Sequence, residues 1–249
     1  GRDTFRIPRG GLKDIVDALS LNIRAAGGEI LTRTRVTRII VENRRARGVV
    51  ALSSHGTITI EAGTVVSNIG PKGTIALAGR EHFGEDYLRR AAEMRPAVGL
   101  DFLFTTDRPL LDFAGTLYTT DTLRKEGWSV PTMMWPEHAP PGKHLLHGFA
   151  VPEKTDSYDP QKEYEAVLHD LHTVFPDFES AGGRLLLRRN FSGEWPCTRA
   201  RQGQDLDHRT PIENLYNVGD GVKPMGWIVG AGAAASGRIV AREILDSLG

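Results

Sequence analysis

Near its carboxyl end the chain carries the sequence Asn214-Leu215-Tyr216-Asn217-Val218-Gly219-Asp220-Gly221. A short apolar run that stops at Gly-Asp-Gly is typical of a buried strand whose end delivers one carboxylate to a cleft. Glycine has no side chain, so a ligand can approach the backbone closely beside it. The sequence therefore predicts a strand that ends at a cofactor site built from Gly219, Asp220 and Gly221.

The residues that follow predict a loop and a long helix. The loop Pro224-Met225-Gly226-Trp227 precedes a helix from about Gly230 to Leu248. Unpaired N–H groups at the start of a helix favour a partly negative group, and a reduced flavin is such a group. Asp220 would then hold ribityl hydroxyls. A plain strand-loop-helix connection explains the same spacing, and both interpretations stay open at this point.

The glycine-rich run 230–235 matches the dinucleotide pattern G-x-G-x-x-A. That pattern needs a strand before it and, after its helix, a second strand that ends in an acidic residue. Here the chain stops at Gly249 directly after the helix, so we assign no nucleotide to this run. We expect instead that the helix packs closely on a neighbour through one stripe of residues, which are Ala233, Gly237, Ala241, Ile244 and Leu248.

Composition narrows the class of partner. Thirty-one basic residues balance thirty-one acidic ones over 249 residues, so no net charge attracts nucleic acid and none is expected as a partner. Cys197 is the single cysteine, which excludes an internal disulfide framework and fits a reducing compartment. No apolar run approaches transmembrane length. We expect a cytoplasmic protein, with contact at a membrane surface left open and the oligomeric state unknown.

The amino terminus begins Gly1-Arg2-Asp3-Thr4-Phe5-Arg6. It has neither an initiator methionine nor the basic-then-apolar pattern of a secretory signal. We therefore expect a processed chain or a fragment of a longer protein.

Hydrophobic spacing divides the chain into sections. Apolar residues from Leu12 to Ile23 recur at helical spacing, which predicts a helix with one buried face. Short β-branched runs from Ile30-Leu31 to Val66 predict a meander of hairpins. The block from about Phe83 to Thr210 is richer in aromatic residues and proline. In it we expect strands at 98–105, 132–135 and 145–151, and an amphipathic helix that carries Tyr164 to Phe175.

The middle block interrupts the other two sections, as an inserted domain would. We expect an α/β fold in which residues 1–75 and 211–249 form one domain. Residues 76–210 are expected to form an inserted substrate-binding domain of mixed sheet and helices, α+β in character.

Several short motifs follow one another along the chain. They are Pro8-Arg9-Gly10-Gly11, Ala26-Gly27-Gly28-Glu29-Ile30, Val36-x-x-Ile39, Ala46-Arg47-Gly48-Val49, Val65-Val66-Ser67-Asn68 and the closing Asn214 to Gly221 with Pro224, Gly226 and Gly232. In this order they resemble the phytoene desaturase-like FAD-dependent oxidoreductases, which share a fold group with the flavin amine oxidases. The section 84–210 resembles the family in general pattern only.

The resemblance implies a flavoprotein body of the FAD/NAD(P)-binding type, with FAD as the cofactor of the intact protein. It implies that the backbone at Val36 meets the adenine and that Asp220 lies beside the ribityl–pyrophosphate part. Five further residues are implied to border the flavin, namely Met225, Gly226, Trp227, Ile228 and Val229. The family's amino-terminal G-x-G-x-x-G unit is missing before Phe5. We therefore expect the carboxy-terminal portion of such a protein, inactive by itself.

The resemblance also implies a reaction class. We expect the intact protein to be a desaturase or dehydrogenase of an apolar, carotenoid-like small molecule, with the flavin performing the hydride chemistry. Two alternatives stay open: a flavin amine oxidase acting on a polar amine, and a non-catalytic binding module that lost its nucleotide-binding half. An aromatic cage with a carboxylate in the middle block would favour an amine, and a long apolar tunnel would favour a polyene. No catalytic acid or base is assigned.

Other residue groups give weaker indications. Glu165, His169 and His172 share a helical face, but a solvated face explains them as well, so no metal site is assigned. Cys197 is expected to be an inert thiol, and no G-x-S-x-G motif supports a hydrolase. Most aromatic residues are expected in core packing, with Trp227 as the exception that meets the ligand.

Overall fold

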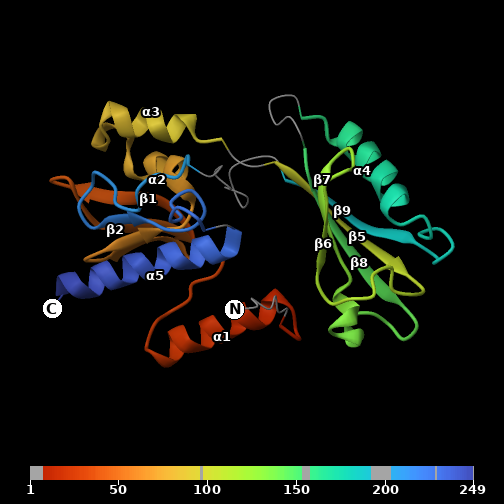
Figure 1. Cartoon of the computed structure of the whole chain (residues 1–249). Coiled ribbons are helices and arrows are strands. Elements are labelled where there is room, and N and C mark those ends of the chain that lie inside the picture. Colours follow the sequence, from red (N-terminus) through yellow and green to blue (C-terminus); the bar gives the residue numbers. More distant parts are fainter. Residues whose placement is uncertain (1–7, 96–97, 153–157, 192–202, 228, 249) are drawn as a thin grey trace. The chain divides into compact units, whose positions relative to one another are not determined.

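The structure of the chain is a computed structural model that describes residues 8–95, 98–152, 158–191, 203–227 and 229–248. The chain divides into two compact units (Figure 1). Unit 1 combines residues 1–30 with 98–192, and unit 2 combines 31–97 with 193–249. The domain limits expected from the sequence lie at other positions, at 75/76 and 210/211, and they stay a prediction for the intact protein.

Unit 2 contains an antiparallel meander of β1 (Arg35–Glu42), β2 (Arg45–Ser53) and β3 (Gly56–Glu61). A two-residue turn joins β1 to β2, and both of its residues, Asn43 and Arg44, have positive φ, as a type I′ hairpin requires. The predicted meander of hairpins is confirmed for β1 to β3. It is wrong for Val65 and Val66, because their strand pairs in parallel with residues 215–217 and forms no hairpin. The prediction of a strand at Ile30-Leu31 is wrong, because the chain turns at 32–33 before β1 begins.

A second sheet in unit 2 pairs two strands that are distant in sequence. β4 (Val65–Ser67) lies parallel to β10 (Leu215–Asn217). Helices α2 (Gly70–Ala78) and α3 (Glu85–Glu93) follow β4, and a 3-10 turn at Arg80–His82 joins them. The apolar core of this unit is a single cluster that includes Ile39, Ala46, Ile75, Phe83, Leu215 and Val222.

Helix α5 (Val229–Leu248) follows β10 and confirms the predicted long helix. Its buried residues are Gly232, Ala235, Ser236 and Val240. The predicted stripe of Ala233, Gly237, Ala241, Ile244 and Leu248 is therefore displaced by one position: Ala241 is exposed, Ala233, Gly237 and Ile244 are partly buried, and the side chain of Leu248 lies outside the described residues. Contacts with the preceding loop select the buried face, since Oγ of Ser236 accepts a hydrogen bond from the amide of Gly219 and a methyl group at Gly232 would lie 3.1 Å from Cβ of Lys223.

Unit 1 is built on a five-stranded antiparallel sheet with the strand order β6-β7-β8-β5-β9. Its strands are β5 (Gly99–Thr106), β6 (Thr116–Thr119), β7 (Lys125–Ser129), β8 (His144–Val151) and β9 (Arg184–Phe191). Helix α4 (Pro160–Val174) lies on one face of the sheet (Figure 1). Asp159 caps this helix, because its side chain accepts a hydrogen bond from the amide of Gln161 at 3.0 Å.

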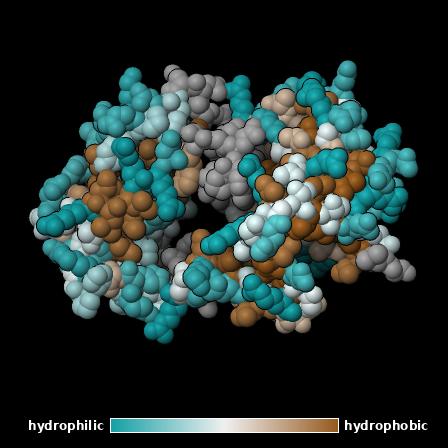
Figure 2. All heavy atoms as spheres, turned by 180° about the vertical axis from the view of Figure 1, so that it is seen from behind, coloured by the Kyte–Doolittle hydropathy of each residue, from teal (hydrophilic) through white to brown (hydrophobic). Residues whose placement is uncertain are grey.

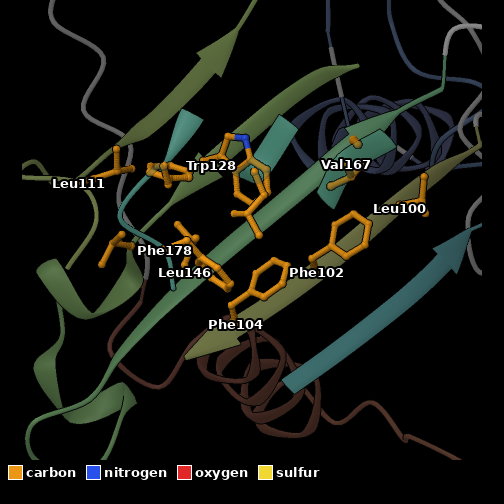
Figure 3. Packing of buried hydrophobic residues seen from close by; sticks show 12 residues of the cluster. Leu100, Phe102, Phe104, Leu111, Trp128, Leu146, Val167 and Phe178 are labelled. Carbon is orange, nitrogen blue, oxygen red and sulfur yellow. The ribbon is translucent and has the colours of Figure 1, made fainter. Parts of the chain in front are cut away.

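The core of unit 1 lies between α4 and the sheet (Figure 3). Alternate residues of β5 point into it, so Leu100, Phe102 and Phe104 are buried while their neighbours are partly exposed. Trp128 is fully buried in the same cluster. The expectation that most aromatic residues serve core packing is confirmed at these positions, and the opposite face of the sheet is left to other residues.

Two sequence predictions in unit 1 are wrong. Residues 132–135 form no strand, because short 3-10 turns at Pro131–Met133 and Pro136–His138 occupy this segment. A proline starts each turn, and proline cannot donate a hydrogen bond to a sheet. Helix α1 (Leu12–Ala25) forms as predicted but has no buried residue. Its amphipathic pattern needs a partner surface, and no part of the described chain covers it.

Apolar side chains are exposed in both units. Figure 2 shows hydrophobic residues among hydrophilic ones on the face that it draws. Leu12 and Leu19 of α1, Met225, and Leu245 of α5 are among the exposed large apolar residues. Within the described ranges, none of the helices has the length and apolar character needed to cross a lipid bilayer.

Candidate functional site: the Gly-Asp-Gly loop of unit 2

The candidate site lies where the two parallel strands of unit 2 end. Because β4 and β10 run in the same direction, their carboxyl ends meet at one edge of the sheet, where ligands bind in open α/β sheets. Asn68 follows β4, and the loop Gly219 to Gly221 follows β10 after Val218. The strand and the loop that the sequence predicted are thus both present.

The two glycines of this loop are required by the backbone. Gly219 has φ 102° and Gly221 has φ 122°, a region that residues with a side chain rarely adopt. A methyl group at Gly219 would also lie 2.2 Å from Oδ1 of Asn68. The loop therefore approaches the end of β4 closely because position 219 has no side chain.

A hydrogen bond fixes the loop to helix α5. The amide of Gly219 donates to Oγ of Ser236 at 2.8 Å, and that hydroxyl donates to the carbonyl of Ala233 at 2.7 Å. Ser236 is buried. The contact holds the start of the loop against the helix, and the amide of Gly219 is satisfied inside the protein rather than by a ligand.

A buried polar network supports the site from behind. Oδ1 of Asn217 accepts a hydrogen bond from Oγ1 of Thr74 at 2.6 Å, and Nδ2 of Asn217 donates to the hydroxyl of Tyr87 at 3.0 Å. Ser67 and Thr74 share a hydrogen bond of 2.7 Å. Burial raises the pKa of Tyr87 to about 12, although the hydrogen bond with Asn217 opposes this shift. The network joins β4, α2, α3 and β10 and so fixes both strand ends.

Asp220 belongs to a compact ionic cluster. Nζ of Lys223 lies 3.0 Å from Oδ1 of Asp220 and 2.9 Å from both carboxylate oxygens of Asp205. The amide of Lys223 also donates to Asp205 at 3.1 Å. Burial by itself would lower the pKa of Lys223, but the hydrogen bonds to Asp205 and Asp220 raise it. The lysine is therefore charged, and it orients the carboxylate of Asp220.

The predicted flavin-bordering loop lies beside this cluster. Met225 and Trp227 are exposed, and Gly226 has φ 84°. Together with Lys223 and Asp205, Met225 and Trp227 line a cavity of about 320 Å³ within unit 2. A methyl group at Gly232 of α5 would lie 3.1 Å from Cβ of Lys223 and 3.2 Å from Cβ of Trp227, so α5 packs closely against this loop.

The structure describes only some of the remaining predicted site residues. Val36 lies in β1 and is 37% exposed. Val229 begins α5, but its side chain lies outside the described residues, as does the whole of Ile228. Cys197, which is expected from the sequence to be an inert thiol, also lies outside the described part of the chain. The structure brings Gly219, Asp220 and Gly221 together with the loop 224–227, and it places Val36 on a separate sheet of the same unit.

Three residues of the site were missed in the sequence. Lys223 carried a detectable signal, since it is a basic residue three positions after Asp220 in a glycine-rich loop. Ser236 and Asp205 carried none, because their roles depend on contacts between distant segments. No group of three metal-binding side chains occurs in the residues that the structure describes. His169 instead lies 3.5 Å from Asp170, and His172 lies 3.8 Å from Glu179.

Comparison with known proteins identifies the family to which this chain belongs. The profile of the flavin containing amine oxidoreductases matches residues 1–245, and the chain belongs to that family. The flavoprotein resemblance read from the motifs is thereby confirmed, as is the α/β flavoprotein fold. The family supports FAD as the cofactor.

Three relatives are similar to this chain over most of its length. The crystal structure of an oxidoreductase from Methanosarcina mazei is 34% identical, with a TM-score of 0.86 over 95% of this chain and 55% of that chain. An uncharacterized protein of Methanocaldococcus jannaschii is 26% identical over 92% of this chain and 52% of that protein. Putrescine oxidase, 16% identical, shares the fold with a TM-score of 0.69 over 96% of this chain and 53% of that one. The chain thus spans about half the length of these relatives.

The residues present at the loop fit a flavin nucleotide. The two glycines give the loop the positive-φ backbone that carries Asp220, and the carboxylate of Asp220 retains 18% of its side-chain surface. Carboxylates accept hydrogen bonds only, which suits the hydroxyl groups of a ribityl chain. The start of α5 lies next in the chain, where N–H groups favour negative charge. The acceptor at Asp220 and the N–H donors at the start of α5 therefore suit a cofactor with hydroxyl groups and a partly negative end.

Proposed function

We propose that the intact protein is an FAD-dependent dehydrogenase or desaturase of a small molecule with a largely apolar body. The observation that carries this proposal is the Gly-Asp-Gly loop at the shared carboxyl edge of β4 and β10, pinned to α5 by Ser236. A plain connection between a strand and a helix needs neither a positive-φ glycine on each side of an acid nor a buried lysine that orients that acid.

In this proposal unit 2 holds the cofactor. Asp220 accepts hydrogen bonds from the ribityl hydroxyls, and Gly219 and Gly221 supply the positive-φ backbone of the loop that presents it. Residues 225–229 border the flavin, and the backbone at Val36 meets the adenine. When bound, FAD accepts the electrons that the substrate loses. The protein residues orient the two molecules and exclude water, and none of them is assigned as a catalytic acid or base.

Unit 1 supplies the substrate surface in this proposal. The sheet face away from α4 carries partly exposed apolar side chains, among them Leu103, Leu145, Phe149 and Leu187. These residues suit an apolar substrate, including a polyene. A polar amine is the alternative substrate, and a non-catalytic binding module is the alternative function. We propose the cytoplasm as the location, because the single cysteine fits a reducing compartment.

The test is flavin binding by the intact protein that contains this chain. We expect the purified protein to show flavin absorbance bands, or to acquire them when apoprotein is mixed with FAD. The same titration with FMN and with riboflavin separates the contribution of the adenine half from that of the flavin half. An intact, folded protein that neither contains FAD nor takes it up would refute the oxidoreductase proposal and leave the binding-module alternative.

A further inference from the structure

Three polar side chains meet on the face of the unit 1 sheet away from α4. Nε2 of His147 on β8 lies 2.6 Å from Oδ1 of Asp101 on β5. Nδ1 of the same ring lies 3.5 Å from Oγ of Ser129 on β7. The strand register produces this meeting, because His147 stands directly opposite Ser129 and diagonally to Asp101. Residues paired in this way project from the same face of a sheet.

The hydrogen bonds define which nitrogen of His147 is available. An ionised carboxylate only accepts, so Nε2 must carry the proton that Asp101 binds. Nδ1 of the neutral ring is then an acceptor. Its distance of 3.5 Å to the hydroxyl of Ser129 is long for a hydrogen bond, which is usually below about 3.0 Å for a hydroxyl donor. A ligand with a better-placed donor can therefore replace the hydroxyl of Ser129 at Nδ1.

An apolar surface lies beside this acceptor. The ring of Phe149 is centred 6.4 Å from that of His147, and the ring of Tyr118 is centred 6.1 Å from that of Phe149. Gly127 lies between Tyr118 and Phe149 in the sheet register. A methyl group there would lie 2.3 Å from the ring of Phe149, so the glycine lets this ring lie flat on the strand. The side chains of His147 and Asp101 keep 36% and 28% of their surface exposed.

The charges around the acceptor favour an uncharged ligand group. Arg189 on β9 is the direct partner of Asp101 in the register, and it is exposed on the same face. Its side chain places a positive charge on that face of the sheet. The charge of Arg189 would repel an ammonium group, whereas a neutral O–H or N–H donor can bind the lone pair of Nδ1.

We infer that His147, oriented by Asp101, accepts a hydrogen bond from the substrate, and that this site takes an O–H or uncharged N–H group attached to an apolar body lying on Phe149 and Tyr118. The inference rests on the proposed function only in naming the ligand as the substrate of the oxidation. The apolar face alone requires only an apolar body, and the inference adds that the substrate carries a polar group at one end. Asp101 is then a positioning residue that fixes the tautomer of His147.

The experiment compares benzyl alcohol with toluene, two probes that share an apolar ring and differ in one hydroxyl. Their affinities for the full chain are measured by ligand-observed NMR, and ring-nitrogen shifts of ¹⁵N-histidine report the tautomer of His147. We expect benzyl alcohol to bind more tightly than toluene, and His147→Phe to weaken benzyl alcohol about fivefold, the size expected for one neutral hydrogen bond. His55→Phe, at an exposed turn of unit 2, is the matched control and should change neither affinity.

Asp101→Asn provides the second variant. It preserves shape but can donate to Nε2, so we expect the proton of His147 to move to Nδ1 and the preference for benzyl alcohol to disappear. A wild-type ring protonated at Nδ1, or a preference for benzyl alcohol that survives in both variants, would overturn the inference. Flavin absorbance of the intact protein is recorded separately. Its absence refutes the proposed function, whereas its presence with unchanged probe binding in both variants refutes only this site.

Discussion

Nζ of Lys223 lies 2.9 Å from each carboxylate oxygen of Asp205, and only 6% of the lysine side chain is exposed. The same ammonium group lies 3.0 Å from Asp220. One buried cation thus connects the segment that carries Asp205 to the loop that ends β10. A buried ion pair stabilises a fold little more than well-packed apolar residues of similar volume would, but removal of one partner leaves an uncompensated buried charge. This asymmetry makes Lys223 the most sensitive position of the site.

Replacement of Lys223 by methionine tests the cluster. Lys223→Met keeps the length of the side chain and leaves Asp205 and Asp220 without their cation, so we expect the free energy of unfolding to fall by roughly 3–5 kcal/mol. Urea unfolding followed by circular dichroism measures it. Lys143→Met is the control, because Lys143 pairs with Asp107 at an exposed site and should cost no more than about 1 kcal/mol. Adding Asp205→Asn to Lys223→Met should recover part of the loss, and equal losses in both lysine variants would contradict this account.

The conformation of Gly219 gives a second prediction. Gly219→Ala forces a side chain into a left-handed backbone region and places its methyl group 2.2 Å from Oδ1 of Asn68. We expect a loss of at least about 2 kcal/mol in the free energy of unfolding, since backbone strain and the clash add together. Gly63→Ala is the matched control, because a methyl group at Gly63 meets no heavy atom within 4 Å. Thermal unfolding of both variants checks the prediction, and a stable Gly219→Ala protein would show that the loop relaxes freely.

A third prediction concerns the cofactor role of Asp220. In the intact protein, Asp220→Asn removes a charged acceptor while Asp205 still holds Lys223. A charged hydrogen bond contributes roughly 1.5–3 kcal/mol, so we expect the dissociation constant of FAD to rise about 10- to 100-fold. Quenching of flavin fluorescence measures it. Asp246→Asn, at an exposed position of α5, should leave the affinity unchanged. Equal affinities in the two variants would remove Asp220 from the cofactor site.

The sequence predicted those parts of the fold in which local pattern and tertiary packing agree. The Asn43-Arg44 hairpin, the capped helix α4 and the Gly-Asp-Gly loop all carry local turn, cap or backbone requirements. Strand β9 was missed, because residues 185–187 are three consecutive leucines and the strand shows neither alternation nor burial. Its register comes from pairing with β5, which no local pattern encodes.

For the site, the sequence likewise predicted only the residues that share one local pattern. Gly219, Asp220 and Gly221 share one loop and were predicted from their spacing, whereas Asp205 and Ser236 reach the loop through contacts between segments distant in the chain. The pattern of α5 indicated a helix with a small-residue face, but the face predicted from it was wrong. The predicted stripe contains Ala233 and the observed one contains Gly232, so the two differ by about one residue of helical rotation. The observed rotation depends on what packs against Val240.

The last prediction concerns Glu126, a buried acid in the core of unit 1. Only 2% of this residue is exposed, and one carboxylate oxygen accepts a hydrogen bond from Nε1 of Trp128 at 2.9 Å. The other oxygen, Oε1, has no hydrogen-bond partner among the described residues. Burial raises the pKa of Glu126 from 4.5 to about 8, and the nearby carboxylate of Asp170 adds to the shift. The folded protein therefore keeps Glu126 protonated at a pH at which the unfolded chain has lost that proton.

The sign of the pH dependence follows from this difference. Between pH 4.5 and about 8 the native state binds one proton more than the unfolded state, so stability falls as pH rises. The slope approaches about 1.4 kcal/mol per pH unit for one such group. Glu126→Gln cannot ionise and keeps an acceptor for Trp128. We expect the variant to lose this slope and to become more stable than the wild type at pH 8, in urea unfolding at pH 5, 6.5 and 8. Glu165→Gln, at an exposed position of α4, should retain the wild-type slope. Parallel pH profiles for the wild type and Glu126→Gln would mean that Glu126 ionises as readily in the folded protein as in the unfolded chain.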